Sequence, residues 1–185
     1  MSVAERAAVV LLPIGEGVRE RVARLQERYI AAVDGKDMNG WLECFTAEGS
    51  YFVQGRDNAE EELPVCLMYD DSYERLADRV TFVTRIWPGA FEDYQTRHFL
   101  QPLSMGALAG GAEGRGGPLI RARTNVQVLS SDQRGQTRIF ATGVYEDLIR
   151  IDPQRFPDDG ESARFERRRL LLDTFATPGV VVYPL

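Results

Sequence analysis

The spacing of apolar side chains divides the chain into a helical first half and a second half of strands. Within residues 17–33 the apolar positions recur every three or four residues, at Val18, Val22, Leu25, Tyr29 and Ala32. This spacing predicts an amphipathic helix that buries one face. After Asp37, a suitable N-cap, a second helix is expected. Its apolar face would be formed by Met38, Trp41, Leu42 and Phe45.

The stretch MYDDSYERLADRV, residues 68–80, sets two adjacent aspartates in front of a third helical pattern. The aspartates are either working carboxylates or the start of a helix. With Asp71 as N-cap, Glu74 takes the third helical position of a capping box, and both carboxylates favour the positive helix end. A metal site would need further ligands converging from elsewhere. We therefore prefer the structural interpretation.

The period changes to two after Trp87-Pro88-Gly89. In residues 119–130 apolar and polar side chains alternate, which predicts a half-buried strand. Residues 137–151 resume this pattern after a polar loop, so the two segments should form an antiparallel hairpin. Shorter strands are expected at 50–53, 97–105 and 164–173, and an acidic loop at 57–62.

These elements predict an α+β fold, with helices gathered against one face of a strongly curved, mostly antiparallel sheet. The length fits a single domain, which we place at residues 17–185 after an N-terminal extension, residues 1–16. Residues 106–117 hold six glycines. They lack the GK[ST] and GxGxxG patterns of phosphate loops and lead into a strand, so we expect a flexible connection. Residues 152–162 should form a second exposed loop.

Charge and composition exclude several classes of function. The net charge of −6 and the pI of about 5.0 argue against a nucleic-acid partner. The one dense basic run, Arg167-Arg168-Arg169, lies in a predicted strand, so its side chains should split between the two faces. No apolar run reaches the roughly 20 residues of a membrane helix or forms a signal-peptide core. We expect a soluble, cytoplasmic protein.

The chain is poor in metal ligands. His98 is the only histidine, and the two cysteines, Cys44 and Cys66, lie far apart without a CxxC partner. A Rieske centre takes two cysteines and two histidines, and a two-His-one-carboxylate iron site needs a second imidazole. This chain alone can build neither site, and buried free thiols are the simpler interpretation of the cysteines.

Four blocks of the sequence carry a resemblance to a known family. They are a helix, turn and WLECFTAEGSYFV between Tyr29 and Val53, MYDDSYERLADRVTFVTR at 68–85, TRHFL at 96–100, and an arginine-rich last strand ending in LLLDTF at 170–175. In this order they resemble the small (β) subunit of aromatic-ring-hydroxylating, Rieske-type non-haem iron oxygenases. The spacing and the closing Val182-Tyr183-Pro184-Leu185 are most similar to small subunits acting on salicylate, anthranilate or terephthalate. Residues 1–16 and the long glycine-rich segment depart from the family pattern.

The resemblance implies a cone fold of the scytalone dehydratase and nuclear transport factor two type, and a mainly structural role. It also implies a large (α) subunit that carries the Rieske [2Fe-2S] cluster, the mononuclear iron and the substrate pocket, with electrons from NAD(P)H through a reductase. The assembly would be an α3β3 hexamer with β–β contacts in a trimer. No cofactor or catalytic residue is then expected on this chain. Arg79, Arg97 and His98 would form a bracing or subunit-interface set, with Asp71 and Asp78 as partners.

A second hypothesis is a self-sufficient isomerase or dehydratase of the ketosteroid-isomerase kind. Here Asp34 or His98 would act as general base and Tyr51 would stabilise an enolate. A cavity enclosing His98 and an acidic residue would favour this hypothesis, whereas a cone packed with side chains would favour the subunit. A third possibility is a small-ligand binding module without turnover.

Overall fold

The computed structural model describes residues 11–89, 93–109, 117–152 and 162–185. The helices are α1 (Glu16–Asp34), α2 (Met38–Glu43), α3 (Arg56–Glu60) and α4 (Tyr73–Thr81), which continues into a π-helical turn, η2 (Phe82–Ile86). The strands are β1 (Leu11–Leu12), β2 (Phe45–Gly55), β3 (Met68–Asp70), β4 (Gln95–Leu108), β5 (Leu119–Ser131), β6 (Thr137–Ile151) and β7 (Ala163–Leu172). None of the described helices is long and apolar enough to cross a bilayer.

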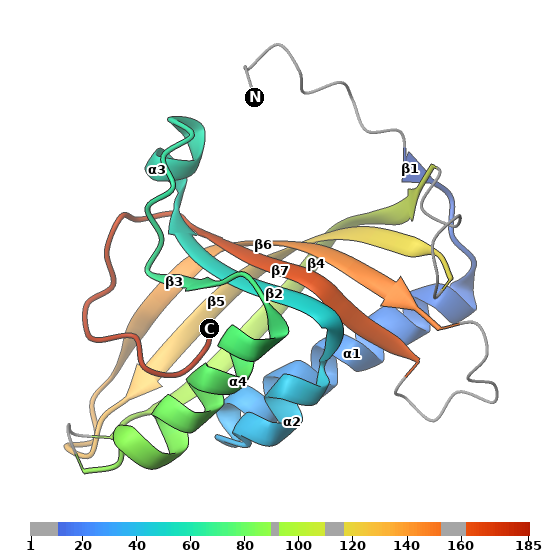
Figure 1. The fold of residues 1–185 in the computed structure, drawn as a ribbon. Helices are drawn as coiled ribbons and strands as arrows, with labels where there is room; N and C mark the ends of the chain where they lie inside the picture. The colour runs from blue at the N-terminus through green and yellow to red at the C-terminus, as the bar shows by residue number, and fades with distance from the viewer. Residues whose placement is uncertain (1–10, 90–92, 110–116, 153–161) are drawn as a thin grey trace.

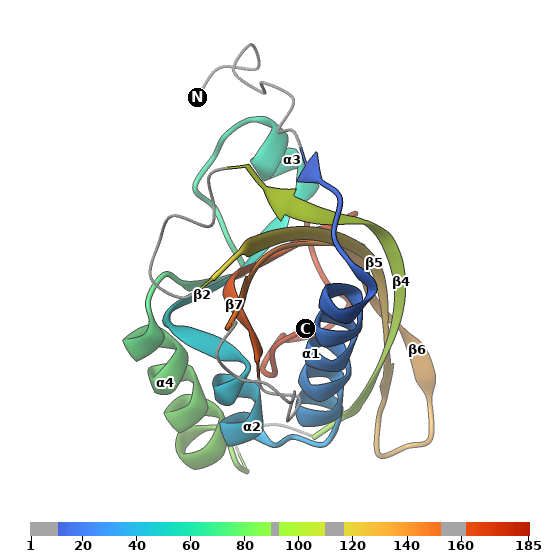
Figure 2. The same ribbon diagram turned by 90° about the vertical axis from the view of Figure 1, so that its right-hand side faces the viewer.

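One seven-stranded sheet in the order β1-β4-β5-β6-β7-β2-β3 forms the body of the protein (Figure 1). Neighbouring strands are antiparallel except β2 and β7, which are parallel. Figure 2 shows the sheet arching around α1, with α2 and α4 beside the open side of the arch and the C-terminal residues inside it. The α+β fold with helices against one face of a curved sheet is confirmed.

The core lies between α1 and the concave face of the sheet. The buried positions of α1 include Val22, Leu25, Tyr29 and Ala32 of the face that the periodicity predicted, whereas Val18 of that face is only partly buried. Trp41 of α2 is fully buried, with its ring 5.1 Å from that of Phe45 and 5.7 Å from that of Tyr51. Burying one large apolar side chain contributes roughly 1.5–3 kcal/mol, so the aromatic side chains account for much of the stability.

The two predicted N-caps differ in outcome. Asp37 caps α2 as predicted, since its Oδ1 accepts from the Gly40 amide at 2.9 Å. The prediction that Asp71 caps α4 is wrong, because Ser72 is the N-cap and accepts from the Arg75 amide at 3.4 Å. Asp70 is held in β3 opposite Tyr51. Residues 68–70, for which no strand was expected, pair as β3, and α4 begins one residue later than predicted, so Glu74 is the second helical residue rather than the third.

Several predicted boundaries are corrected by the sheet. Phe45 begins β2 instead of ending α2, and β2 extends well beyond the predicted residues 50–53. The predicted acidic loop at 57–62 contains α3. The glycine-rich segment is partly strand, because β4 continues through Gly106 to pair with β1. A Cβ at Gly106 would lie 2.7 Å from the Cβ of Leu11, so only glycine admits this close strand.

The remaining strand predictions agree with the structure. The hairpin of residues 119–130 and 137–151 is present as β5 and β6, and the strands at 97–105 and 164–173 correspond to β4 and β7. The expected loops fall mainly on residues 110–116 and 153–161, which lie outside the described residues. Of the expected N-terminal extension, Leu11 and Leu12 join the sheet as β1.

Replacing Trp41 tests the packing around α2. We expect Trp41→Ala to lower the free energy of unfolding by about 3–5 kcal/mol, because a large buried ring is removed and the site cannot fully collapse. The measurement is urea unfolding followed by circular dichroism. Phe175→Ala is the control, since Phe175 is 77% exposed and its loss should change stability by less than about 0.5 kcal/mol. Equal effects of the two substitutions would contradict this account of the core.

Candidate functional site

Asp34 and His98 form a buried polar pair where the end of α1 meets the start of β4. The Nδ1 of His98 lies 2.7 Å from Oδ1 of Asp34, and the Thr96 hydroxyl donates to the same oxygen at 2.9 Å. The backbone amide of His98 donates to Oδ2 at 3.1 Å. The His98 side chain has no exposed surface. The pair thus ties the last residue of α1 to the edge of the sheet.

The charge state of Asp34 fixes the hydrogen bonding of His98. Burial favours the neutral carboxyl, but the hydrogen bonds and charge of His98, together with Thr96, outweigh burial and hold the pKa of Asp34 below its usual value of 3.8. The ionised carboxylate can only accept, so Nδ1 of His98 must carry a proton. Nε2 is buried and has no hydrogen-bond partner among the described residues.

A pocket of about 490 Å³ lies between α1 and the strands β4 and β5. Its wall is mainly apolar and includes Val22, Ile30, Leu100 and Met105, together with His98. The volume falls within the usual range for small-molecule pockets, about 300–1,000 Å³. Among its described lining residues Glu27 is the acidic one, and Asp34 is not present. Because the imidazole has no accessible surface, a molecule in this pocket could reach Nε2 only after a rearrangement.

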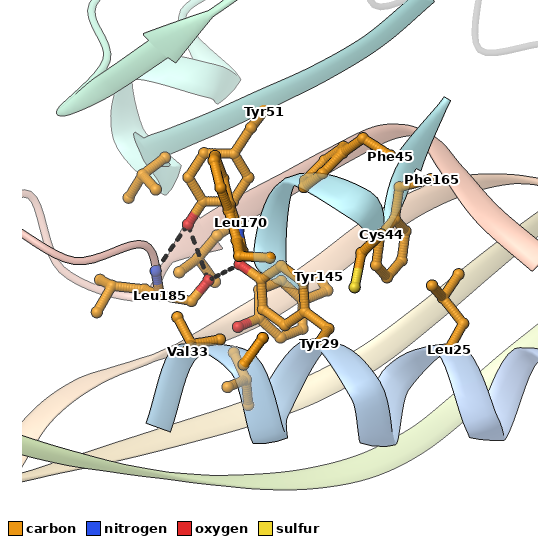
Figure 3. Close-up of a cluster of buried hydrophobic side chains, with 14 of the residues drawn as sticks. Leu25, Tyr29, Val33, Cys44, Phe45, Tyr51, Tyr145, Phe165, Leu170 and Leu185 are labelled. Atoms are coloured by element: carbon orange, nitrogen blue, oxygen red, sulfur yellow. Dashed lines mark hydrogen bonds between the residues drawn. The ribbon is translucent and has the colours of Figure 1, made fainter. Parts of the chain in front are cut away.

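The interior of the cone is occupied by tyrosines and the C-terminal residues (Figure 3). The hydroxyls of Tyr29 and Tyr51 donate to the carbonyl oxygen of Leu185 at 2.7 and 2.8 Å, and the Leu185 amide donates to Tyr51 at 2.8 Å. All three residues are fully buried. Burial raises the pKa of Tyr29 to about 12 and that of Tyr51 well above its usual value, so both hydroxyls stay protonated. Tyr51 is therefore engaged with the C-terminal segment.

Arg168 lies deeper in the same interior. Its guanidinium carbon is 3.6 Å from the ring centre of Tyr145, 3.9 Å from that of Tyr29 and 4.3 Å from that of Phe165. A fully buried cation in this position is stabilised by the aromatic faces and needs an anionic partner. The guanidinium is thus surrounded by three aromatic rings.

Asp147 and Gln26 complete the surroundings of Arg168. The Arg168 Nε lies 3.4 Å from Asp147 Oδ1, and Arg168 Nη2 donates to Gln26 Oε1 at 2.6 Å. Gln26 in turn donates to Asp147 Oδ2 at 3.0 Å. Burial raises the pKa of Asp147 to about 6, although Arg168 and Gln26 act in the opposite direction. The three residues join α1, β6 and β7.

Sequence reasoning did not include Arg168, Asp147 or Gln26 among the candidate residues. It did predict that the arginines at 167–169 split between the faces of a strand, and this is confirmed, since Arg168 is buried and Arg167 is exposed. The signal that could have identified the cluster is alternation, because Arg168 shares a face with Leu170 and Leu172. A charge at such a position needs a buried partner.

The predicted bracing set is not one cluster. Arg79 forms a forked ion pair with Asp70, whose Oδ1 accepts from Nη2 at 3.0 Å, and Asp71 pairs with Arg75 at 3.4 Å. Asp71 and Asp78 are therefore not the partners of Arg79 and His98 within the described residues, since Asp70 holds Arg79 and Asp34 holds His98. In the first case Asp70, the last residue of β3, rather than Asp71 lies against Arg79 of α4. The pairing of Asp78 with Arg97 stays a prediction.

Two members of the set have other surroundings. Arg97 donates through Nη1 to the Thr96 carbonyl at 3.5 Å. Asp78 lines a shallow hollow of about 210 Å³ together with Asp70 and Arg79. Whether any of these residues faces another subunit stays a prediction. In the described part of the chain, no group of three or more His, Cys, Asp or Glu side chains is arranged to hold a metal ion.

Comparison with known proteins finds a matching family profile and similar small subunits of dioxygenases. The sequence profile described as "Ring hydroxylating beta subunit" matches residues 28–176. The small subunit of anthranilate 1,2-dioxygenase from Burkholderia cepacia is 26% identical over 161 residues, covering 87% of this chain and 90% of that protein. The β 2 subunit of the terminal oxygenase component of terephthalate 1,2-dioxygenase from Comamonas sp. is 25% identical over 165 residues, covering 89% and 97%.

A solved structure supports the fold. A protein from Novosphingobium aromaticivorans described as the β subunit of an aromatic-ring-hydroxylating dioxygenase has a TM-score of 0.69 to this chain and is 23% identical to it. The match covers 91% of this chain and 96% of that one. The curved sheet around a long helix is thus shared with a small subunit of this kind.

The Asp34 and His98 pair predicts a pH dependence of stability. The folded-state pKa of Asp34 lies below its unfolded value, so its contribution is complete above about pH 3.8 and is lost as the pH falls through the folded value. We expect Asp34→Asn to destabilise the protein near neutral pH by roughly 1.5–3 kcal/mol, the cost of losing hydrogen bonds to a charged group. The difference from wild type should shrink in acid. Urea midpoints measured from neutral to acidic pH give the result.

The matched control for Asp34 is Glu48→Gln, an acid-to-amide change at an exposed position of β2. It should leave the midpoints unchanged throughout. If the urea midpoints of Asp34→Asn and wild type differed by the same amount from neutral pH to the most acidic pH measured, Asp34 would not be the ionised partner of His98.

Arg168 offers a second stability test. Arg168→Met should cost about 3–5 kcal/mol, because it leaves Asp147 buried without its cation. Arg167→Met, on the exposed side of the same strand, should change stability by less than about 0.5 kcal/mol. Adding Asp147→Leu to Arg168→Met should recover part of the loss, as measured by urea unfolding. If Arg168→Met were as stable as Arg167→Met, the buried pair would not have the importance given to it here.

Proposed function

This chain belongs to the ring hydroxylating beta subunit family, and we propose on that basis that it is the non-catalytic small subunit of the terminal oxygenase of an aromatic-ring-hydroxylating dioxygenase. Its role is to support a large subunit that carries the active site. The names of the relatives point to aromatic carboxylates as the substrates of the assembled enzyme.

The observation that carries this proposal is that the centre of the cone is packed with side chains, while the pocket of about 490 Å³ beside it, between α1 and β4, does not reach an exposed imidazole. The place where a cone fold could hold a substrate is taken by Tyr29, Tyr51 and Leu185, and beside them by the stacked Arg168. The groups best suited to acid-base chemistry, Asp34 and His98, are bonded to each other and shielded from solvent. The interior therefore acts as a rigid core that fixes the outer surface of the sheet.

The partner follows from the chemistry of ring hydroxylation. The large subunit would supply the Rieske [2Fe-2S] cluster and the mononuclear iron, with electrons reaching it from NAD(P)H through a reductase. This chain has one histidine and two cysteines in all, fewer than a Rieske centre alone requires. We propose an α3β3 assembly with contacts between copies of this chain, in the cytoplasm.

A second candidate is the self-sufficient isomerase or dehydratase, which two observations favour: the Asp34 and His98 hydrogen bond, and the pocket of about 490 Å³ lined by His98 and the acidic Glu27. Its third expected member does not join the pair, because Tyr51 bonds to Leu185. The shielded imidazole also lacks access to a reacting atom, which a general base requires. The subunit role therefore fits the geometry better.

Co-expression with a candidate large subunit tests the proposal. We expect both chains to elute as one complex, and hydroxylation of an aromatic carboxylate to require that complex. His98→Gln in this chain should leave the turnover number per complex unchanged. Stoichiometric iron, or turnover of a small molecule, in the purified chain alone would overturn the proposal, as would failure to enter any complex with large subunits.

A further inference from the structure

Four arginines gather on the outer, convex face of the sheet. Arg121 and Arg123 lie on β5, and Arg167 and Arg169 lie on β7. They flank two residues of β6, since Arg123 and Arg169 are both opposite Glu146, while Arg121 and Arg167 are both opposite Leu148. Directly paired residues of neighbouring strands share a face. We call these four arginines the arginine face.

The charge of the arginine face is not balanced locally. Glu146 is approached by Arg123 at 3.6 Å and by Arg169 at 3.8 Å. Within the described residues, neither Arg121 nor Arg167 takes part in an ion pair. Partial desolvation, followed by repulsion from Arg169 and Arg121, lowers the pKa of Arg167 from its usual value, against the attraction of Glu146 and Glu166. The face therefore carries an excess of positive charge in a protein whose net charge is −6.

Aromatic side chains continue the arginine face at one side. Arg169 is opposite Phe52 of β2, and Phe52 is opposite Tyr69 of β3. The rings of Phe52 and Tyr69 are 5.2 Å apart, and Tyr69 is 48% exposed. Arginine and tyrosine are enriched in protein interfaces, where they supply most of the binding energy. The composition of this surface is that of a protein-binding site.

A segment of opposite charge projects from the same molecule. Helix α3 stands away from the sheet at the upper left of Figure 1 and carries the exposed carboxylates Asp57, Glu60 and, just after the helix, Glu61. Exposed apolar side chains follow it, at Leu63, Val65 and Leu67, which are 42%, 57% and 39% exposed. We call residues 56–67 the acidic arm. A protruding segment that mixes carboxylates with exposed apolar groups has the character of a contact made with another chain.

We propose that the arginine face binds the acidic arm of a second copy of this chain. The two surfaces have complementary charge, and a contact between them places carboxylates beside the arginines that lack an ion-pair partner. The arm also brings apolar side chains to the exposed ring of Tyr69. Within one molecule the face and the arm adjoin, since Arg169 donates to Gln54 at 2.7 Å and Gln54 donates to the Leu63 carbonyl at 2.7 Å. They are nevertheless different sets of residues, so a contact between copies is heterologous and can close into a ring. The proposal extends the assembly proposed above, although it needs only this chain.

Charge reversal in the full-length chain tests the contact. Sedimentation velocity over a range of concentrations should show wild-type self-association that weakens in high salt, since the contact is between charged surfaces. Arg121→Glu with Arg167→Glu should weaken association by about tenfold or more, because like charges then face each other across the contact. Glu60→Arg with Glu61→Arg should do the same. The chain carrying all four substitutions should associate again.

The matched control is Arg19→Glu with Arg134→Glu, two exposed arginines outside the face, which makes the same change in net charge and should leave association intact. Circular dichroism and thermal unfolding of each variant establish that it is folded. A wild-type chain that stays monomeric at the highest soluble concentration would overturn the proposal. Unchanged association of either reversed variant, or a folded fourfold variant that fails to associate, would do so as well.

Binding of the large subunit is measured on the same variants. If the arginine variant loses the large subunit while copies of this chain still associate, the arginine face belongs to the large subunit and our assignment is wrong. If self-association of the charge-reversed variants changes as expected and no large subunit binds, the contact between copies is supported and the proposed function is wrong.

Discussion

Arg168 lies at the centre of the concave face, stacked against Tyr29 and Tyr145 and facing Asp147. A strongly curved sheet must fill its concave side, and a buried cation is tolerated there only with an anionic partner and further hydrogen bonds. Gln26 of α1 supplies those hydrogen bonds. The same interaction therefore positions the long helix against β6 and β7 and closes the interior. What remains available for function is the outside of the molecule.

The C-terminal residues complete this closure. Leu185 takes hydrogen bonds from two tyrosine hydroxyls that come from α1 and β2. The chain itself thereby fills the centre of the cone. A pocket of about 490 Å³ remains between α1 and the strands β4 and β5, and it does not expose the imidazole of His98. A filled cone suits a protein that presents surfaces to other chains, and the outer face of the sheet is the most distinctive of these surfaces.

Much of the fold could be predicted from the sequence, because α1 and the strands β5 and β6 each bury one face and so repeat with a clear period. The helix cap at Ser72 could not, since pairing of Asp70 with Tyr51 across β2 and β3 decides where the strand ends. The family resemblance supplied the cone and the expected partner. Asp34 and His98 were named from the sequence as a possible pocket pair, and the structure brings them together, but Tyr51 is held elsewhere by Leu185. Arg168 and Asp147 were missed because ion pairing between strands depends on register, which the sequence pattern does not give.

The central claim is that His98 and Asp34 are shielded inside this chain and take no part in chemistry. His98 is its only histidine, so the nitrogen NMR signals of the imidazole report on this interior without ambiguity once any affinity tag is removed. Nuclear magnetic resonance of the isolated chain should show a proton on Nδ1, and the signals should stay unchanged when aromatic carboxylates are added to saturation. Two results would contradict the account. One is a shift of the Nε2 signal on addition of such an acid. The other is exchange of the Nδ1 proton of His98 with bulk water as fast as in a free imidazole.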